Sequence, residues 1–351
     1  MFKLSIITIN YNNAEGLRKT LASVASQTYP HIEHIIIDGG SSDNSVEGIR
    51  EYESSLGSRL SPLASRLKWL SEKDTGIYNA MNKGIEIALG HRIVNEDHTS
   101  APLASSPHRL IALDHYIQIL NSGDILAAPD VTERMMAALA ERNEKINNQQ
   151  SEQFDNQQLK QSTNDIVNIV ENKIVDIVEN KKSASPAIFY GNMIKEYPDG
   201  RRVKDTCGIA DYTPESFLYF YKGTLNHDCA YIRKDLFEKY GLYNENMKIC
   251  SDWEWYVRAI VLGGEKTVYT NIDVTIFDMT GISESDGKNK DIILKERREY
   301  LVSILPRTIL HDYDRYSLPI VQYQRLKKYH LWSIVHFVER VLFKLERIFR
   351  R

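Results

Sequence analysis

Apolar, strand-like runs alternate with helical patterns through the first 140 residues, and this alternation constrains the fold more than any other feature. Strands are predicted within residues 3–13, 31–38 and the first part of 67–90, and in the apolar run before Asn121. Helices are predicted from Ala14, after 41–43, over the second half of 67–90, and from Asp130 to about Ala140. Strands that alternate with helices pair in parallel, so we expect an α/β fold with an open, twisted, Rossmann-like sheet.

Three aspartates follow predicted strands: Asp38 opens "DGGSSD", Asp74 opens "DTGIY" and Asp124 ends "NSGD". Ligands of such sheets bind outside the carboxyl ends of the strands, so the fold places these carboxylates along one edge. Taken singly, each has an ordinary alternative as a turn, a helix entry or a helix cap. The chain contains neither G-x-G-x-x-G nor G-x-x-x-x-G-K-[ST]. Three carboxylates at strand ends, in a chain without a glycine-rich phosphate loop, therefore favour diphosphate binding through a metal ion.

Two insertions interrupt the alternation, at residues 91–113 and 141–186. The second is rich in Asn, Gln, Glu and Lys, and it contains the near-repeat "IVNIVENK" (166–173) and "IVDIVENK" (174–181). Two copies of an octad are too few for a repeat array. We interpret this segment as an amphipathic helical or disordered excursion, with partner binding as the alternative.

The second half of the chain predicts further strands and short helices. A strand and a hairpin turning at 198–200 are expected within 187–204, and a strand with a short helix within 227–243. "SDWEWYVRA" is predicted to form a helix with Ser251 as its N-cap, and late strands follow in 265–279.

Composition narrows the class of protein. The net charge of −3 gives no broad basic field for nucleic acid. The three cysteines lack metal-ligand spacing and suggest a reducing compartment. The N-terminus leads straight into a strand-like run without a signal-peptide pattern, and no apolar run approaches the roughly 20 residues that span a bilayer. We therefore expect a cytoplasmic protein.

Five segments follow one another along the chain: "SIITINYNN", "QTYPHIEHIIIDGGSSDNS", "SEKDTGIYNAMNKGIEIALG", "LNSGD" and "SDWEWYVRA". In this order they resemble the inverting family-2 glycosyltransferases, and most closely the bacterial branch that builds capsules, exopolysaccharides and lipopolysaccharide O-chains. The resemblance implies a GT-A fold, with a mostly parallel sheet flanked by helices. The implied domain covers 1–286, with a nucleotide-binding half at about 1–130 and an acceptor half at about 187–286. A helical extension over 287–351 follows.

The resemblance also implies a nucleotide-binding set. Thr8 and Asn10 would approach the nucleotide, although the family often has Pro at the position of Asn10. Asp38 would accept a hydrogen bond from the uracil imide N–H, which favours uridine over cytidine. Asp74 would lie beside the base and ribose. Lys83 could line the donor pocket, with a solvated helix residue as the alternative.

"NSGD" resembles the family's metal-binding motif, with Asn121 in place of the first acid. Asn121 is therefore assigned to the nucleotide-binding set rather than to the metal. The resemblance implies that Asp124 holds Mn²⁺ or Mg²⁺, which suits oxygen ligands. Asp252 resembles the catalytic base, and Glu254 is a weaker candidate. Asp252 would also compensate the dipole at the start of its helix. His227 would contact the metal or the diphosphate, or serve as a structural histidine.

The C-terminal segment 325–351 carries eight Lys and Arg against two Glu, and its apolar residues recur at helical spacing. Such a basic amphipathic helix suits the anionic inner leaflet of the cytoplasmic membrane. A helix packed on the protein's own surface, or a dimer contact, is the alternative.

The predicted function is transfer of one sugar from a UDP-sugar to a glycan or a polyprenyl-diphosphate-linked acceptor. No Q-x-x-R-W-like signature of processive synthases occurs, which favours single transfer over polymerisation. A sugar-nucleotide pyrophosphorylase would need a glycine-rich N-terminal loop, and "TINYNNAEG" is not one. A catalytically degenerate domain that scaffolds a polysaccharide assembly complex is the non-enzymatic alternative.

Overall fold

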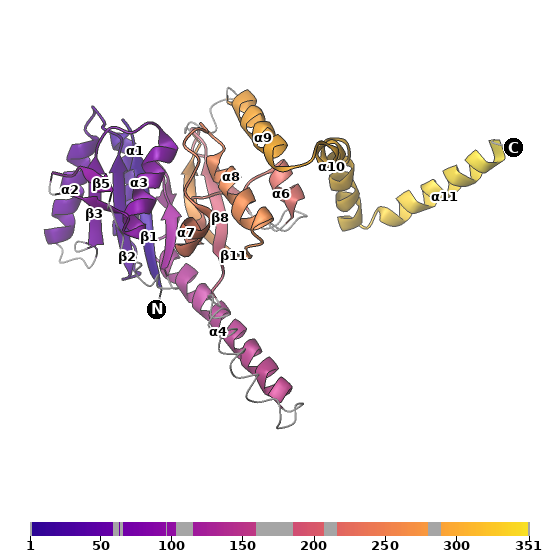
Figure 1. Ribbon diagram of the computed structural model, residues 1–351, viewed down its shortest axis with the longest axis horizontal. Helices are drawn as coiled ribbons and strands as arrows, with labels where there is room; N and C mark the ends of the chain where they lie inside the picture. Colours follow the sequence, from indigo (N-terminus) through magenta and orange to yellow (C-terminus); the bar gives the residue numbers. More distant parts are fainter. Residues whose placement is uncertain are drawn as a thin grey trace.

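We describe a computed structural model of the 351-residue chain (Figure 1). The residues that the structure describes are 2–58, 63, 66–95, 97–102, 115–158, 185–206, 216–279 and 289–349. The "IVNIVENK" repeat and most of the second half of the 91–113 insertion lie outside these residues.

The N-terminal half of the sheet confirms the predicted parallel pairing. Its four parallel strands are β1 (Lys3–Asn10), β2 (Ile32–Asp38), β3 (Leu67–Ser71) and β6 (His115–Ile119). β1 lies between β2 and β6, and β2 pairs with β3. Asn10 is in register with Asp38, so the polar residues that end these strands meet at one edge of the sheet.

Helices cover both faces of this half-sheet. They are α1 (Ala14–Ala25), α2 (Ser45–Ser58) and α3 (Ile77–Leu89). α3 packs on β1 and β2, and a Cβ at Gly84 would come within 2.3 Å of Ile7 Cγ2, so this contact requires glycine. α1 and α2 close a smaller apolar cluster around Ile36 and Trp69. In α3 the buried face begins at Tyr78, whereas Ile77 is exposed.

The C-terminal half of the sheet mixes parallel and antiparallel pairs. Its strands are β7 (Ile125–Leu126), β8 (Ile188–Glu196), β9 (Arg202–Asp205), β10 (Ala230–Arg233) and β11 (Thr267–Asp278). β10 lies antiparallel between β6 and β8, and β11 runs parallel to β8. The strand order is β3-β2-β1-β6-β10-β8-β11-β7, with β9 paired to β8. The α/β fold class is confirmed.

Short helices complete this half: α6 (Phe217–Lys222), α7 (Asp235–Tyr240) and α8 (Ser251–Tyr256), which continues as a π-helical turn over Val257–Leu262. The N-cap of α8 is Cys250, so the prediction of Ser251 as the cap is wrong. Ser251 is instead the first helical residue, and its Oγ accepts from the backbone N–H of Asn244 at 2.6 Å. Trp253 and Trp255 are fully buried, which places this face of α8 in the core.

Two helices reach beyond the sheet. α4 (Val131–Gln158) begins where expected but extends well past Ala140, into the segment predicted as an excursion. At the other end of the chain, α9 (Lys290–Ile304) and α10 (Arg307–Lys328) lead to α11 (Trp332–Phe349), which projects away from the rest of the molecule (Figure 1). Among the described residues, no helix is long and apolar enough to cross a bilayer.

The 91–113 insertion begins with a β-hairpin. Its two strands, β4 (Arg92–Val94) and β5 (Ser100–Pro102), pair antiparallel and form a separate small sheet beside β3. The sequence pattern marked this segment only as an interruption.

Candidate active site

The first polar cluster lies at the carboxyl ends of β1 and β2 and centres on Asp38, which is fully buried. Asp38 Oδ1 accepts from Asn10 Nδ2 at 2.8 Å and from Ser41 Oγ at 2.6 Å. Asp38 Oδ2 accepts from the Ser41 backbone N–H at 2.9 Å and from Ser71 Oγ at 2.7 Å. A carboxylate has about four lone-pair positions, and four donors occupy them here. Direct contact with a uracil N–H stays a prediction, and it requires one of these donors to move.

Asn10 offers a free acceptor in the same cluster. Its side chain is 4% exposed, and its Oδ1 has no hydrogen-bond partner among the described residues. A buried acceptor without a partner costs free energy, so it favours binding of a group that donates to it. The imide N–H of a base is such a group.

Asp74 lies directly over the Asp38 cluster. A Cβ at Gly39 would come within 2.3 Å of Asp74 Oδ2, so a larger residue there would displace the Asp74 carboxylate. Asp74 Oδ1 accepts from the Gly76 N–H at 3.0 Å. Burial and the nearby Asp38 charge raise the pKa of Asp74, while the Gly76 bond and the Lys83 charge oppose that rise. The structure thus brings Asn10, Asp38 and Asp74 together, and their contact with a nucleotide stays a prediction.

Thr8 and Lys83 lie close to this cluster but face other protein groups. Thr8 is fully buried, and its Oγ1 lies 3.0 Å from His34 Nε2. Lys83 is 7% exposed, pairs with Glu72 at 2.9 Å and donates to the Lys73 carbonyl at 3.1 Å. The alternative of a solvated Lys83 is therefore wrong, and its contact with a nucleotide stays a prediction.

The second polar cluster joins β6, the loop before β10, and α8. Asn121 Nδ2 lies 3.3 Å from His227 Nε2, and His227 Nδ1 lies 3.2 Å from Asp252 Oδ2. Tyr78 OH of α3 donates to Asp252 Oδ1 at 3.1 Å and also to the carbonyl of Ile249. With His227 Nδ1–H donating to Asp252 and Nε2 accepting from Asn121 Nδ2, three residues predicted separately form one hydrogen-bonded chain: Asn121, His227 and Asp252.

The pairing of His227 with Asp252 shifts the pKa of both groups. Burial would raise the pKa of Asp252, but the hydrogen bond and charge of His227 hold it below its usual value. Burial would lower the pKa of His227, but Asp252 holds it above its usual value. Glu254, the weaker candidate for the base, is buried and pairs with Arg258 at 2.9 Å, so it serves the core.

Asp124 is 3% exposed and sits among other acids. Its Oδ1 accepts from the Asp278 backbone N–H at 3.0 Å. Burial, followed by the charge of Asp228, raises the pKa of Asp124 well above its usual range, whereas His227 lowers it. A buried carboxylate with such neighbours calls for a positive charge.

The residues around Asp124 fit a divalent cation that takes some of its ligands from the protein and the others from a diphosphate. Asn121 Oδ1 is buried and has no hydrogen-bond partner among the described residues, so it adds a free oxygen beside a carboxylate. Within the described ranges, no group of three or more His, Cys, Asp or Glu side chains is arranged to hold a metal ion. Mg²⁺ is commonly held by one or two carboxylates together with substrate phosphates, so an incomplete protein cage is compatible with it.

The two clusters are linked through the loop after β1. Asn12 N–H donates to Ser41 Oγ at 2.8 Å in the first cluster. Asn13 Nδ2 donates to the Ser122 carbonyl at 3.1 Å, in the turn before Asp124. One continuous polar edge therefore runs from Asp38 to Asp124.

Sequence reasoning missed four members of this edge: Ser41 and Ser71 as donors to Asp38, Tyr78 as donor to Asp252, and Asp228 beside Asp124. Ser41 lies in the "DGGSSD" motif, just before the helix predicted after 41–43. Nothing in the sequence connects Tyr78 with Asp252, because 174 positions separate them and only the fold brings them together.

Comparison with known proteins agrees with this geometry. Residues 5–98 match Glycosyl transferase family 2. A glycosyltransferase of Mycobacterium tuberculosis (strain ATCC 25618 / H37Rv), itself uncharacterized, is 33% identical over 138 residues, which are 39% of this chain and 40% of that relative. A PGL/p-HBAD biosynthesis glycosyltransferase of the same strain is 22% identical over 296 residues, 84% of this chain and 82% of that relative. The chain is thus similar to family 2 glycosyltransferases over 5–98 and to the two named glycosyltransferases over the shares given.

Solved structures show the same fold. S. aureus TarS 1–349 in complex with UDP-GlcNAc aligns with a TM-score of 0.53 at 13% identity, over 93% of this chain and 73% of that one. The mannosyltransferase PcManGT of Pyrobaculum calidifontis, in complex with GDP-Man and Mn²⁺, aligns with a TM-score of 0.50 at 13% identity, over 97% of this chain and 80% of that one. The GT-A fold is confirmed.

Proposed function

We propose that the chain is an inverting glycosyltransferase that moves one sugar from a UDP-sugar to a glycan or lipid-linked acceptor in cell-surface polysaccharide biosynthesis. The observation that carries the proposal is the hydrogen-bonded chain Asn121–His227–Asp252, which lies beside Asp124 on the same polar edge as Asp38. Solved relatives with the same fold bind UDP-GlcNAc or GDP-Man, which supports a nucleotide-sugar donor.

The donor would lie along the edge, with its base toward Asn10, Asp38 and Asp74 and its diphosphate toward Asn121 and Asp124. Asn10 Oδ1 is the free buried acceptor at the base end, and Asn121 Oδ1 is the free one at the diphosphate end. A divalent cation held by Asp124 would neutralise charge that develops on the departing diphosphate. A relative with bound Mn²⁺ supports a cation in this family.

Asp252 is the proposed base. Its carboxylate accepts the proton of the acceptor hydroxyl, the acceptor oxygen forms a bond to the anomeric carbon, and the bond from that carbon to the diphosphate breaks. A sugar nucleotide already has a good leaving group, so no second carboxylate is needed to protonate it, in contrast to a glycosidase. Tyr78 and His227 each hold one oxygen of Asp252 and so fix its orientation.

The test is an assay of UDP release from a panel of UDP-sugars, with Mn²⁺ and with membrane lipid extracts or oligosaccharides as acceptors. We expect acceptor-dependent release with at least one UDP-sugar. If no nucleotide sugar is consumed with any acceptor although the protein is folded, the scaffold alternative is favoured.

The C-terminal helix supports a membrane contact at the inner face of the cytoplasmic membrane. The side chains of Ile334, Val338 and Leu342 are 60%, 47% and 56% exposed, although they share one face of α11. Segment 325–351 carries a net charge of +6 from eight basic and two acidic residues. An exposed apolar face beside excess positive charge matches the surface of an anionic bilayer.

We expect the full chain to sediment with vesicles that contain anionic phospholipid, and a chain ending at residue 324 to stay in solution. Leu342→Glu should release the full chain from the vesicles, because it places a charge on the apolar face. Ser333→Glu is the matched control, since it adds the same charge at another exposed position of α11 and should reduce binding much less. Equal sedimentation of the truncated and full chains would contradict the membrane contact.

A further inference from the structure

The β4–β5 hairpin is attached to the end of β3 at two points. The backbone N–H of Ser71 donates to the His98 carbonyl at 3.0 Å. The ring of His98 stacks on Trp69, with centroids 3.5 Å apart and an angle of 13° between the planes. The hairpin therefore fixes the last residues of β3, directly before the loop that carries Asp74.

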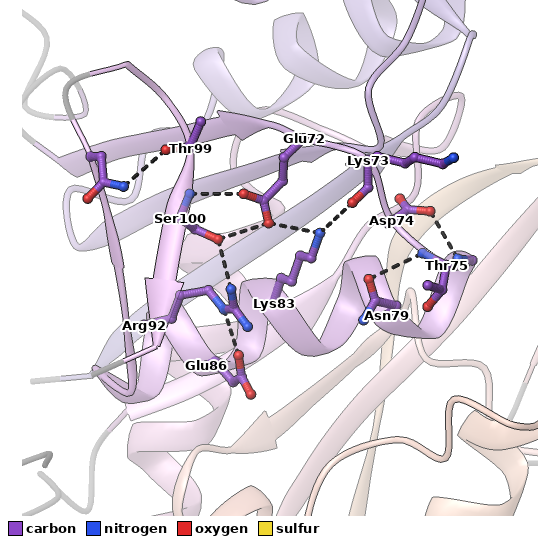
Figure 2. Close-up of polar contacts among 12 residues, drawn as sticks. Glu72, Lys73, Asp74, Thr75, Asn79, Lys83, Glu86, Arg92, Thr99 and Ser100 are labelled. Carbon is purple, nitrogen blue, oxygen red and sulfur yellow. Dashed lines mark hydrogen bonds and ion pairs between the residues drawn. The ribbon is translucent and has the colours of Figure 1, made fainter. Parts of the chain in front are cut away.

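Glu72 connects the hairpin to that loop. Glu72 Oε2 accepts from the Ser100 backbone N–H at 2.9 Å, and Oε1 accepts from Ser100 Oγ at 3.0 Å. Ser100 Oγ also accepts from Arg92 Nη1 at 2.8 Å, and Arg92 Nε pairs with Glu86 at 2.6 Å. Figure 2 shows this series of contacts running from the hairpin to α3.

Lys83 of α3 completes the connection on the other side of Glu72. Its Nζ lies 2.9 Å from Glu72 Oε1 and donates to the Lys73 carbonyl at 3.1 Å (Figure 2). The Lys83 side chain is only 9% exposed, so Glu72 is the counter-charge that makes its burial tolerable. Ser100, Glu72 and Lys83 thus hold the backbone one residue before Asp74.

On the side away from the hairpin, Asp74 has little room to move. The backbone N of Lys73 would lie 3.2 Å from a Cβ at Gly40, and Asp74 Oδ2 lies against Gly39. The backbone N–H of Glu72 donates to the Asp38 carbonyl at 3.0 Å. The loop is therefore confined between the Asp38 cluster and the hairpin network, and a shift on the hairpin side would move Asp74.

We propose that the β4–β5 hairpin positions Asp74 for nucleotide binding, through the contacts of Ser100 with Glu72 and of Glu72 with Lys83. Glu72, Ser100 and Lys83 are positioning residues here, and none of them needs to touch the nucleotide. The inference rests on the proposed function, because Asp74 matters to a donor only if the chain binds one. It gives the insertion a role in donor binding and explains why Lys83 is buried rather than solvated.

The test compares UDP affinity in the presence of Mn²⁺ for the full chain and its variants by calorimetry. Glu72→Gln and Ser100→Ala should each weaken UDP binding, by about five- to tenfold for a lost hydrogen bond. Glu86→Gln is the matched control, because it makes the same chemical change in the same network but has no contact with the loop; it should leave affinity unchanged. In an Asp74→Asn background, Glu72→Gln should have little further effect, since both changes act through the same side chain.

Hydrogen exchange of residues 73–76 in the free protein gives a second readout that does not depend on UDP. Glu72→Gln should accelerate this exchange, and Glu86→Gln should not. Unchanged exchange in Glu72→Gln, or an additive effect with Asp74→Asn on affinity, would overturn the inference. If the wild type binds no UDP, the proposed function fails, while the exchange comparison still decides whether the hairpin holds the loop.

Discussion

Asp252→Asn is expected to reduce the rate of sugar transfer by about 10²–10⁴-fold, the range usual for loss of a general base. The asparagine keeps the size of the side chain and can still accept from Tyr78, so the site should retain its shape. UDP affinity should change little, because Asp252 acts on the acceptor hydroxyl. The measurement is acceptor-dependent UDP release under saturating donor, together with UDP affinity by calorimetry.

Glu254→Gln is the matched control for this prediction. It removes a carboxylate from the same helix, but Glu254 pairs with Arg258 in the core, so the change should lower stability and leave the rate per folded molecule close to that of the wild type. If Asp252→Asn keeps the wild-type rate, or if both variants lose activity equally, Asp252 is not the base.

Asp124→Asn is expected to abolish the metal-dependent part of UDP binding. The asparagine oxygen can still accept from the Asp278 N–H, so the fold should be preserved, but the negative charge that would hold the cation is lost. A ligand at 100 times its dissociation constant stabilises the folded state by about 2.7 kcal/mol, and this gain should disappear. Calorimetric titration of UDP with and without Mn²⁺ measures the loss.

The ligand-free Asp124→Asn protein provides the control for folding. Because the substitution removes a buried carboxylate near Asp228, its unfolding temperature should be no lower than that of the wild type. If this variant still binds UDP in a Mn²⁺-dependent way, Asp124 does not hold the cation.

The sequence predicted well those elements whose pattern is local. The strands before Asn10 and Asp38 are uninterrupted apolar runs, and such runs are typical of strands buried on both faces. Because parallel strands end at one edge, their polar end residues could be predicted to meet. The structure confirms this for Asn10 and Asp38, which are in register.

The details that the sequence could not predict depend on contacts between distant segments. Asp38 was predicted to accept from a uracil N–H, but in the structure Asn10, Ser41 and Ser71 already donate to it. Ser251 has the residue type of an N-cap, yet tertiary contact with Asn244 places it inside the helix. The residue types alone do not show which donor reaches which acceptor.

The most direct test of the central claim is the thermal unfolding of the full chain with UDP, CDP, GDP and a panel of UDP-sugars, each with and without Mn²⁺. The account predicts a clear rise in unfolding temperature with UDP compounds and Mn²⁺ together, and smaller rises with CDP or GDP. The absence of any shift with every nucleotide, under conditions in which the protein unfolds cooperatively, would contradict a nucleotide-sugar site on this edge of the sheet.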